Sequence, residues 1–210
     1  MNTPNLQFWF EFASTYSYLS AARIEDEAAL AGVPVRWEPF LLGPIFAERG
    51  WDDSPFKVYS AKGRYMWRDL ERLCAKYGIP FAKPSRFPRN SLLAARVACL
   101  ARATSEHWLP EFVKAVFRAN FAEDREIADA TEVRLILDSL GQPGVRIVQQ
   151  AQAPENKQRL REQTRRAVEI GIFGAPSFVI GEELFWGNDR LEDALRWASS
   201  QVNEDAGSGR

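Results

Sequence analysis

Segments with the pattern of β-strands lie near the two ends of this 210-residue chain. In residues 6–12 apolar side chains recur at every second position, a period that indicates a strand, and residues 35–40 resemble a second strand. Between them, residues 16–31 contain no Gly or Pro and follow the hydroxyl residues Ser14 and Thr15. This pattern predicts a helix with a capped N-terminus. A helix that connects two strands in this way favours a parallel strand pair.

Strand patterns return close to the C-terminus, where residues 177–180 and 183–186 flank Gly181-Glu182, a pair that can form a hairpin turn. Asn188 or Asp189 can then cap a last helix. The whole order is therefore β-α-β, a long middle section, and β-β-α. The economical interpretation is a single sheet built from both ends of the chain.

The middle section has no convincing strand pattern between residues 61 and 168, whereas residues 43–55 indicate a loop because Gly and Pro punctuate them. Amphipathic helices separated by Gly and Pro are expected at residues 63–77, 91–104, 109–120, 131–140, 145–152 and 155–170. The sequence thus predicts a discontinuous α/β domain of residues 1–45 and 170–210, with an inserted helical domain of residues 46–169.

The composition is that of an ordinary globular protein, with 46% hydrophobic residues, 26% charged residues and a formal net charge of -1. This balance gives no reason to expect nucleic acid or an anionic membrane as a partner. The first residues lack a basic segment followed by an apolar one, and there is no apolar run of about 18 residues. We therefore expect a cytoplasmic protein without a membrane span.

Cysteine and histidine are scarce. Cys74 and Cys99 form no C-x-x-C pair, and His107 is the only histidine. We interpret the two cysteines as reduced thiols of the core. These three separate residues offer no soft-ligand metal site, so no metal is expected.

The element order resembles the thioredoxin fold of the DsbA type, an α/β fold with a large all-helical insertion. In that family a C-x-x-C pair lies where the first strand meets the first helix. Here the corresponding residues 11–19 read Glu-Phe-Ala-Ser-Thr-Tyr-Ser-Tyr-Leu, with Ser14 and Ser17 in place of the cysteines. Without sulfur there is no dithiol–disulfide couple, so the sequence disfavours a disulfide oxidoreductase.

Three motifs are similar to those of 2-hydroxychromene-2-carboxylate isomerases and kappa-class glutathione transferases. They are the serine motif above, Phe-Gly-Ala-Pro-Ser-Phe at 173–178, and Phe-Trp-Gly-Asn-Asp-Arg-Leu at 185–191. A stretch at 62–66, Lys-Gly-Arg-Tyr-Met, also resembles the start of the insertion in these families. The Trp-Gly-Asn-Asp form is closer to the isomerases than to the kappa transferases.

The resemblance implies glutathione as a cofactor. Ser14 is the catalytic candidate, because a hydroxyl at a helix N-terminus can donate a hydrogen bond to a thiolate that the helix dipole also favours; a plain N-cap is the alternative role. Ala175 would pair through its backbone with the cysteinyl part, ahead of a cis Pro176. The other residues implied to bind glutathione are Thr15, Tyr16, Lys62, Trp186, Gly187, Asn188 and Asp189.

The second substrate would occupy an acceptor pocket. The resemblance and the loop pattern suggest Lys57 and Phe87 as substrate-binding residues, with Trp9, Trp51 and Tyr59 as further lining. Arg86 and Arg89 flank Phe87 and are candidates to hold a substrate carboxylate.

The implied reaction interconverts 2-hydroxychromene-2-carboxylate and trans-o-hydroxybenzylidenepyruvate in aromatic degradation, by reversible addition of a thiolate to a conjugated carbon. Two alternatives stay open: a kappa-like transferase or peroxidase that consumes glutathione, and a non-enzymatic glutathione-binding module. The resemblance also implies a homodimer with a small aromatic molecule as its partner.

Overall fold

The structure is a computed structural model that describes residues 5–48, 50 and 59–207, with side chains up to residue 201. Its four-stranded sheet has the order β2-β1-β3-β4. The central strand β1 runs parallel to β2, with Leu6 opposite Val35, and antiparallel to β3, with Phe8 opposite Phe178. The strands are β1 (Leu6–Phe10), β2 (Val35–Pro39), β3 (Ser177–Ile180) and β4 (Glu183–Trp186). The predicted mixed sheet and the cis Ala175–Pro176 bond are both confirmed.

The helices agree closely with the sequence pattern, and residues 61–168 contain no strand, as predicted. One prediction was wrong: residues 42–48 form a helix instead of a loop. Pro44 is the third residue of that helix, where a missing N–H leaves no helical hydrogen bond unmade. The helices are α1 (Thr15–Ala31), α2 (Leu42–Glu48), α4 (Ser60–Tyr77), α5 (Leu92–Ala103), α6 (Leu109–Phe121), α7 (Ala130–Ser139), α8 (Gly144–Ala151), α9 (Pro154–Glu169), the 3-10 turn η1 (Asn188–Arg190) and α10 (Leu191–Gly207).

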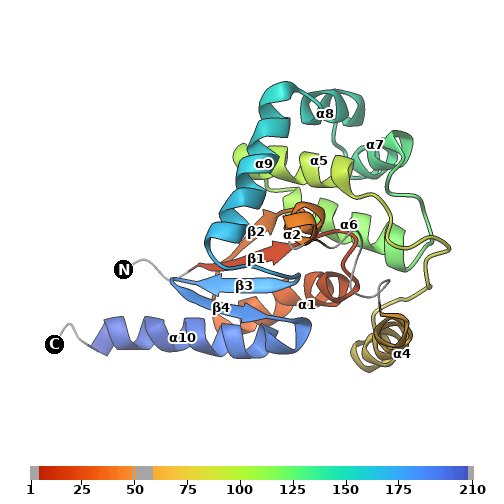
Figure 1. The fold of residues 1–210 in the computed structure, drawn as a ribbon. Helices are drawn as coiled ribbons and strands as arrows, with labels where there is room; N and C mark the ends of the chain where they lie inside the picture. Colours follow the sequence, from red (N-terminus) through yellow and green to blue (C-terminus); the bar gives the residue numbers. More distant parts are fainter. Residues whose placement is uncertain (1–4, 49, 51–58, 208–210) are drawn as a thin grey trace.

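The helices lie around the sheet in two groups (Figure 1). Helix α10 runs along the β3–β4 side, whereas α5, α7, α8 and α9 gather beyond the edge formed by β2. Helix α4 stands apart from this group, next to the start of α1. The N-terminus of α1 and the ends of the strands therefore lie between α10 on one side and the cluster of α5, α7, α8 and α9 on the other.

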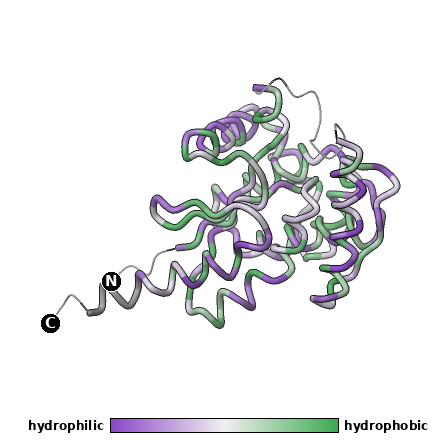
Figure 2. Tube along the Cα trace, turned by 60° about the horizontal axis from the view of Figure 1, so that its bottom comes forward, coloured by the Kyte–Doolittle hydropathy of each residue, from purple (hydrophilic) through white to green (hydrophobic). Residues whose placement is uncertain are grey.

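The sheet and the helical insertion share one hydrophobic core. Phe10, the last residue of β1, and Phe12, two residues further on, lie 6.2 Å and 5.2 Å from the ring of Phe117 in α6, measured between ring centroids. Figure 2 shows hydrophobic stretches alternating with hydrophilic ones along the helices, as amphipathic helices require. Because the core is continuous, the division into a discontinuous domain and an inserted domain stays a prediction from the sequence.

A buried carboxylate also connects the insertion to the sheet. Glu38 of β2 has no exposed surface, and it pairs with Arg102 of α5 and accepts a hydrogen bond of 2.6 Å from Gln163 of α9. A buried charge is tolerated when it is paired and hydrogen-bonded in this way.

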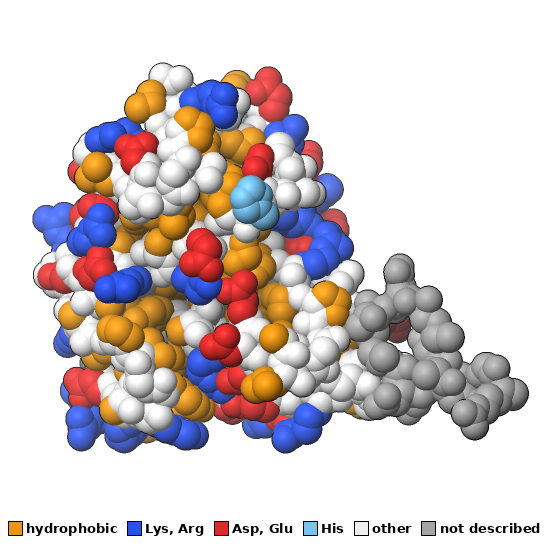
Figure 3. All heavy atoms as spheres, turned by 180° about the vertical axis from the view of Figure 1, so that it is seen from behind, with side chains coloured by type: hydrophobic (Ala, Val, Ile, Leu, Met, Phe, Trp, Pro, Cys, Tyr) orange, Lys and Arg blue, Asp and Glu red, His pale blue; other side chains and the backbone are white. Residues whose placement is uncertain are grey.

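The surface carries charges of both signs. On the face seen in Figure 3, acidic and basic side chains lie next to one another, with hydrophobic side chains between them. Of the helices in the described part of the chain, none is both long enough and apolar enough to cross a bilayer.

Candidate active site

A cleft of about 1550 Å³ opens where α1 begins. It is larger than the roughly 300–1000 Å³ of a typical small-molecule site, so it has room for more than one small ligand. The cleft brings together all the described residues that the resemblance implied for glutathione, together with Phe87 of the suggested substrate pocket. These residues are Ser14, Thr15, Tyr16, Lys62, Phe87, Ala175, Pro176, Trp186, Gly187, Asn188 and Asp189.

Ser14 caps helix α1 and also connects it to the loop before β3. Its Oγ accepts a hydrogen bond from the N–H of Ser17 at 3.1 Å, which is the N-cap contact expected from the sequence. The same hydroxyl donates to the backbone carbonyl of Ala175 at 2.9 Å. Two residues that the sequence assigned separately to glutathione are therefore in direct contact across 161 positions of the chain.

The loop before β3 exposes part of its backbone to the cleft. Ala175 is half-buried, and its amide N–H has no hydrogen-bond partner within the described residues. The Trp186 ring covers Gly174 so closely that a β-carbon at Gly174 would collide with the indole. Trp186 also packs on Phe173, with 4.8 Å between ring centroids. These contacts fix the loop from the side of β4.

The turn after β4 depends on Gly187 and Asn188. Gly187 has a φ of 114°, which favours glycine, and its N–H donates to the carbonyl of Pro176 at 3.0 Å. Asn188 is buried, and its Oδ1 accepts from Ser20 at 3.1 Å and from Arg23 at 3.4 Å. The Asn188 side chain thus holds the turn against α1.

Asp189, by contrast, projects from this turn into solvent. Its side chain is 74% exposed, and its carboxylate lies 3.5 Å from the guanidinium of Arg190. An exposed carboxylate at the rim of the cleft is available to a cationic group of a ligand.

Helix α4 forms the opposite wall. The Tyr16 hydroxyl donates to Asp69 of α4 at 3.0 Å. Burial, followed by the negative charge of Asp69, raises the pKa of Tyr16, so this phenol stays protonated at neutral pH. Lys62 is exposed one turn from the start of α4, with its ammonium 4.9 Å from the centroid of the Tyr59 ring.

The prediction for Trp9 and Tyr59 was wrong, because neither lines the cleft. Trp9 is completely buried and packs edge-on against Phe40, with 6.0 Å between ring centroids. Helices cover both faces of the sheet, so both sets of alternating β1 side chains are internal. Tyr59 precedes α4, is 54% exposed and lies outside the lining. Lys57 and Trp51 lie outside the described residues.

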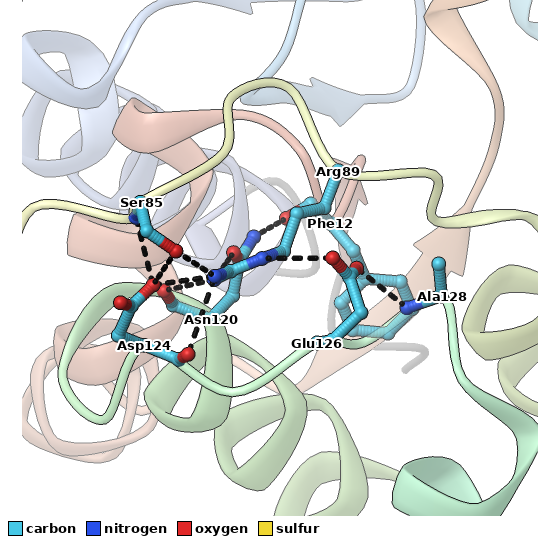
Figure 4. A network of polar contacts seen from close by, with 7 residues as sticks. All are labelled: Phe12, Ser85, Arg89, Asn120, Asp124, Glu126 and Ala128. Atoms are coloured by element: carbon cyan, nitrogen blue, oxygen red, sulfur yellow. Dashed lines mark hydrogen bonds and ion pairs between the residues drawn. The ribbon is translucent and has the colours of Figure 1, made fainter.

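The two arginine candidates for a substrate carboxylate also differ from the expectation. Arg89 borders the cleft, but its guanidinium is buried and is shared among Asp124, Asn120 and Glu126 (Figure 4). Its charge is already neutralised by two carboxylates. Arg86 is exposed and lies outside the lining.

The sequence reasoning missed Glu11. This residue follows β1, is only 6% exposed and borders the cleft. Its carboxylate accepts from the N–H of Ala13 at 2.9 Å and from the hydroxyl of Ser91. Burial raises the pKa of Glu11 to about 7, although both hydrogen bonds work in the opposite direction. A charged residue between Phe10 and Phe12 was the signal in the sequence that could have revealed it.

Comparison with known proteins settles the family. The model of the DsbA-like thioredoxin domain matches residues 5–196, which is most of the chain. The chain belongs to the DsbA-like thioredoxin family.

The relatives of this DsbA-like protein carry the names of two kinds of enzyme. A protein named 2-hydroxychromene-2-carboxylate isomerase, from Sphingobium xenophagum, is 26% identical over 190 residues, which are 90% of this chain and 95% of the relative. Glutathione S-transferase kappa 2 of Caenorhabditis elegans is 24% identical, with 90% of this chain and 89% of the relative aligned. The solved structure of a 2-hydroxychromene-2-carboxylate isomerase superposes with a TM-score of 0.84 at 26% identity, covering 98% of this chain and 99% of that one.

Proposed function

We propose that this DsbA-like protein is a glutathione-dependent isomerase that interconverts 2-hydroxychromene-2-carboxylate and trans-o-hydroxybenzylidenepyruvate. The observation that carries the proposal is the convergence of three distant motifs on one cleft: the Ser14 segment, the Ala175-Pro176 loop and the Asn188-Asp189 turn. The isomerase name of a relative that aligns over 95% of its own length favours this reaction. On sequence grounds alone we also propose a cytoplasmic homodimer that acts in aromatic degradation.

The donors and acceptors of the cleft fit glutathione. The Ala175 N–H has no partner within the described residues, and it suits a peptide carbonyl. The exposed Asp189 carboxylate suits the α-ammonium of the γ-glutamyl group, and the Lys62 ammonium suits a carboxylate. When bound, glutathione supplies a thiolate nucleophile for the conjugated carbon of the substrate.

Ser14 and the start of α1 stabilise negative charge in this proposal. The first N–H groups of a helix carry partial positive charge, which favours an anion at this end. The Ser14 hydrogen points to the Ala175 carbonyl in the structure. It must therefore rotate away from that oxygen in order to donate to a sulfur.

An apolar wall suits the aromatic substrate. The side chains that form this wall come from α2 and the residue before it, from the loop before α5, and from the first residue of α5. They are Leu41, Leu42, Phe46, Phe87 and Leu92. Phe87 is held edge-on by Trp67, with 4.8 Å between ring centroids. Such a wall excludes water from the reacting double bond.

The test is to follow the absorbance of 2-hydroxychromene-2-carboxylate with the purified protein, with and without glutathione, while free thiol is measured in parallel. We expect isomerisation only when glutathione is present, with no loss of free thiol. Loss of one thiol per substrate would instead show a kappa-like transferase. Binding of glutathione without any turnover would favour the non-enzymatic module.

A further inference from the structure

One nearly buried carboxyl residue that borders the cleft, Glu11, has no role in the proposed binding of glutathione. Glu11 lies three residues before Ser14, and the Ser14 N–H donates to the Glu11 carbonyl at 3.0 Å. This tight turn, together with the hydrogen bond from Ala13 N–H, folds the Glu11 carboxylate back alongside the start of α1. Its other partner, Ser91, lies in the same cleft lining, where the apolar Leu92 follows it and Phe87 lies four residues before it.

No charged neighbour compensates this carboxylate among the described residues. Its only partners there are the neutral Ser91 hydroxyl and Ala13 N–H. The nearest arginine along the chain from Ser91, Arg89, directs its guanidinium to Asp124 and Asn120 (Figure 4). Burial of a carboxylate without a cation favours its protonated form.

No other titratable group of the cleft is among the causes of the raised pKa of Glu11. The pKa of Tyr16 responds to Asp69, Tyr65 and Asp189, whereas the pKa of Glu11 responds to burial and to its two neutral partners. The groups in question are Tyr16 of α1, Lys62, Tyr65, Asp69, Lys76 and Tyr77 of α4, Arg89 of the loop before α5, and Asp189 and Arg190 of the turn after β4. Glu11 therefore titrates independently of them.

We propose that Glu11 is a catalytic acid–base residue that protonates and later deprotonates the carbonyl oxygen of a conjugated ketone bound against the apolar wall. The proposal rests on the proposed function. When a nucleophile bonds to the conjugated carbon, the C=C electron pair moves toward the carbonyl and the C=O pair becomes a lone pair on oxygen. The Glu11 O–H bond then breaks and an O–H bond forms on that oxygen.

The return steps restore every group. The enol O–H gives its proton back to the Glu11 carboxylate, the C=O and C=C bonds re-form, and the nucleophile leaves with its electron pair. No oxidant or reductant is needed. Between the two steps the former double bond is single, so rotation about it interconverts the isomers. Ser91 and Ala13 hold the carboxyl group in place for both transfers.

The first experiment measures the protonation state of the Glu11 carboxyl group in the absence of turnover. Difference infrared spectra of the wild type minus Glu11→Gln, recorded across pH without glutathione, report the protonated carboxyl band. We expect a band that is present at pH 6 and disappears with a midpoint near pH 7. A carboxyl group that is already ionised at pH 6 would overturn the proposal, because it would have no proton to give.

The second experiment is the pH profile of kcat/KM for the chromene acid in the presence of glutathione. We expect kcat/KM of the wild type to fall above about pH 7; this fall is the alkaline limb of the profile. Glu11→Gln should lack the alkaline limb and should be slower than the wild type by about 10²-fold or more at pH 6. Glu11→Asp should restore the limb. The matched control is Glu38→Gln, another buried carboxyl residue, which lies outside the cleft and should keep the wild-type limb.

The outcomes separate the two proposals. Turnover by the wild type and Glu11→Gln with the same pH profile would overturn the role of Glu11 and leave the isomerase intact. Absence of wild-type turnover at every pH would overturn the proposed isomerisation and the role of Glu11 with it. Circular dichroism of each variant identifies a rate loss that comes from unfolding.

Discussion

At the scale of single residues, Ser14 has two hydrogen-bonding roles that substitution can separate. Ser14→Ala removes the cap of α1 and the contact with the Ala175 carbonyl, so we expect a loss of about 0.5–2 kcal/mol in the free energy of unfolding. If the hydroxyl also donates to the bound thiolate, its loss should slow turnover roughly 10–200-fold near neutral pH, because such a bond is worth about 1.5–3 kcal/mol. The rate defect should shrink at higher pH, where the thiol ionises unaided. Urea unfolding, thiolate absorbance and turnover across pH measure the three effects.

Ser17 provides the matched control for Ser14. It occupies the second cysteine position of the motif, but it is completely buried, and its Oγ has no hydrogen-bond partner in the described part of the structure. Ser17→Ala should therefore leave the thiol pKa and turnover unchanged. A thiol pKa that is unchanged in Ser14→Ala as well would show that Ser14 is a helix cap only.

Cleft residues that belong to a recognisable sequence motif, such as Ser14 and Asp189, could be predicted. Residues whose position in or outside the cleft depends on their burial could not. Glu11 looked like one more polar position of an alternating strand, yet β1 ends at Phe10 and Glu11 belongs to the turn. Trp9 was assigned to the acceptor pocket, yet residues of α2 and α9 bury its side of the sheet. Coverage of a sheet face depends on distant elements, which a local pattern does not contain.

At the scale of elements, the helices of the insertion were predictable because glycine and proline mark most of their ends. Gly78, for example, ends α4 in the left-handed conformation, and Pro154 begins α9. Helix α2 was missed because Gly43 and Pro44 lie inside its first turn instead of before it. Breaker residues show that a boundary is near, and only the surrounding packing decides on which side of it they fall.

The turn between β4 and α10 supplies a prediction at this scale. A β-carbon at Gly187 would lie 2.5 Å from Asp189 Oδ1, and a φ of 114° is essentially restricted to glycine. Gly187→Ala should displace the Asp189 carboxylate and weaken glutathione binding roughly tenfold or more, the loss expected when a charged hydrogen-bond partner is removed. Calorimetric titration with glutathione measures the affinity, and Asp189→Ala should show a similar loss.

Gly181 is the control for this backbone effect. It also has a positive φ, of 59°, but a β-carbon there would meet nothing within 4 Å. Gly181→Ala should lower stability by about 1–2 kcal/mol through backbone strain and leave glutathione affinity unchanged. Equal affinities for the wild type and Gly187→Ala would remove the turn from the glutathione site.

At the scale of the whole molecule, the two ends of the chain and the insertion between them enclose one site. Ser14 comes from the N-terminal part, Ala175 and Asp189 from the C-terminal part, and Ser91 and Lys62 from the insertion. The continuous aromatic core and the Glu38 contacts join these parts below the cleft. The order of strands and helices made this fold predictable, whereas the cleft itself required the contacts between parts.

The pH dependence of global stability tests the environment of Glu11 in the folded molecule. Its pKa rises from the ordinary 4.5 to about 7 on folding, so the folded state holds this proton more tightly than the unfolded state. The stabilisation is fully present below about pH 4.5 and is lost as pH rises through 7, with a total of roughly 3 kcal/mol. Other groups titrate identically in the wild type and in Glu11→Gln, so their contributions cancel in the difference between the two proteins. Urea unfolding at pH 5 and pH 8 should show Glu11→Gln gaining about 2.5 kcal/mol relative to the wild type at the higher pH, because a part of the total is already lost at pH 5. A difference that does not change with pH would mean that the Glu11 carboxylate is already ionised in the folded protein at pH 5.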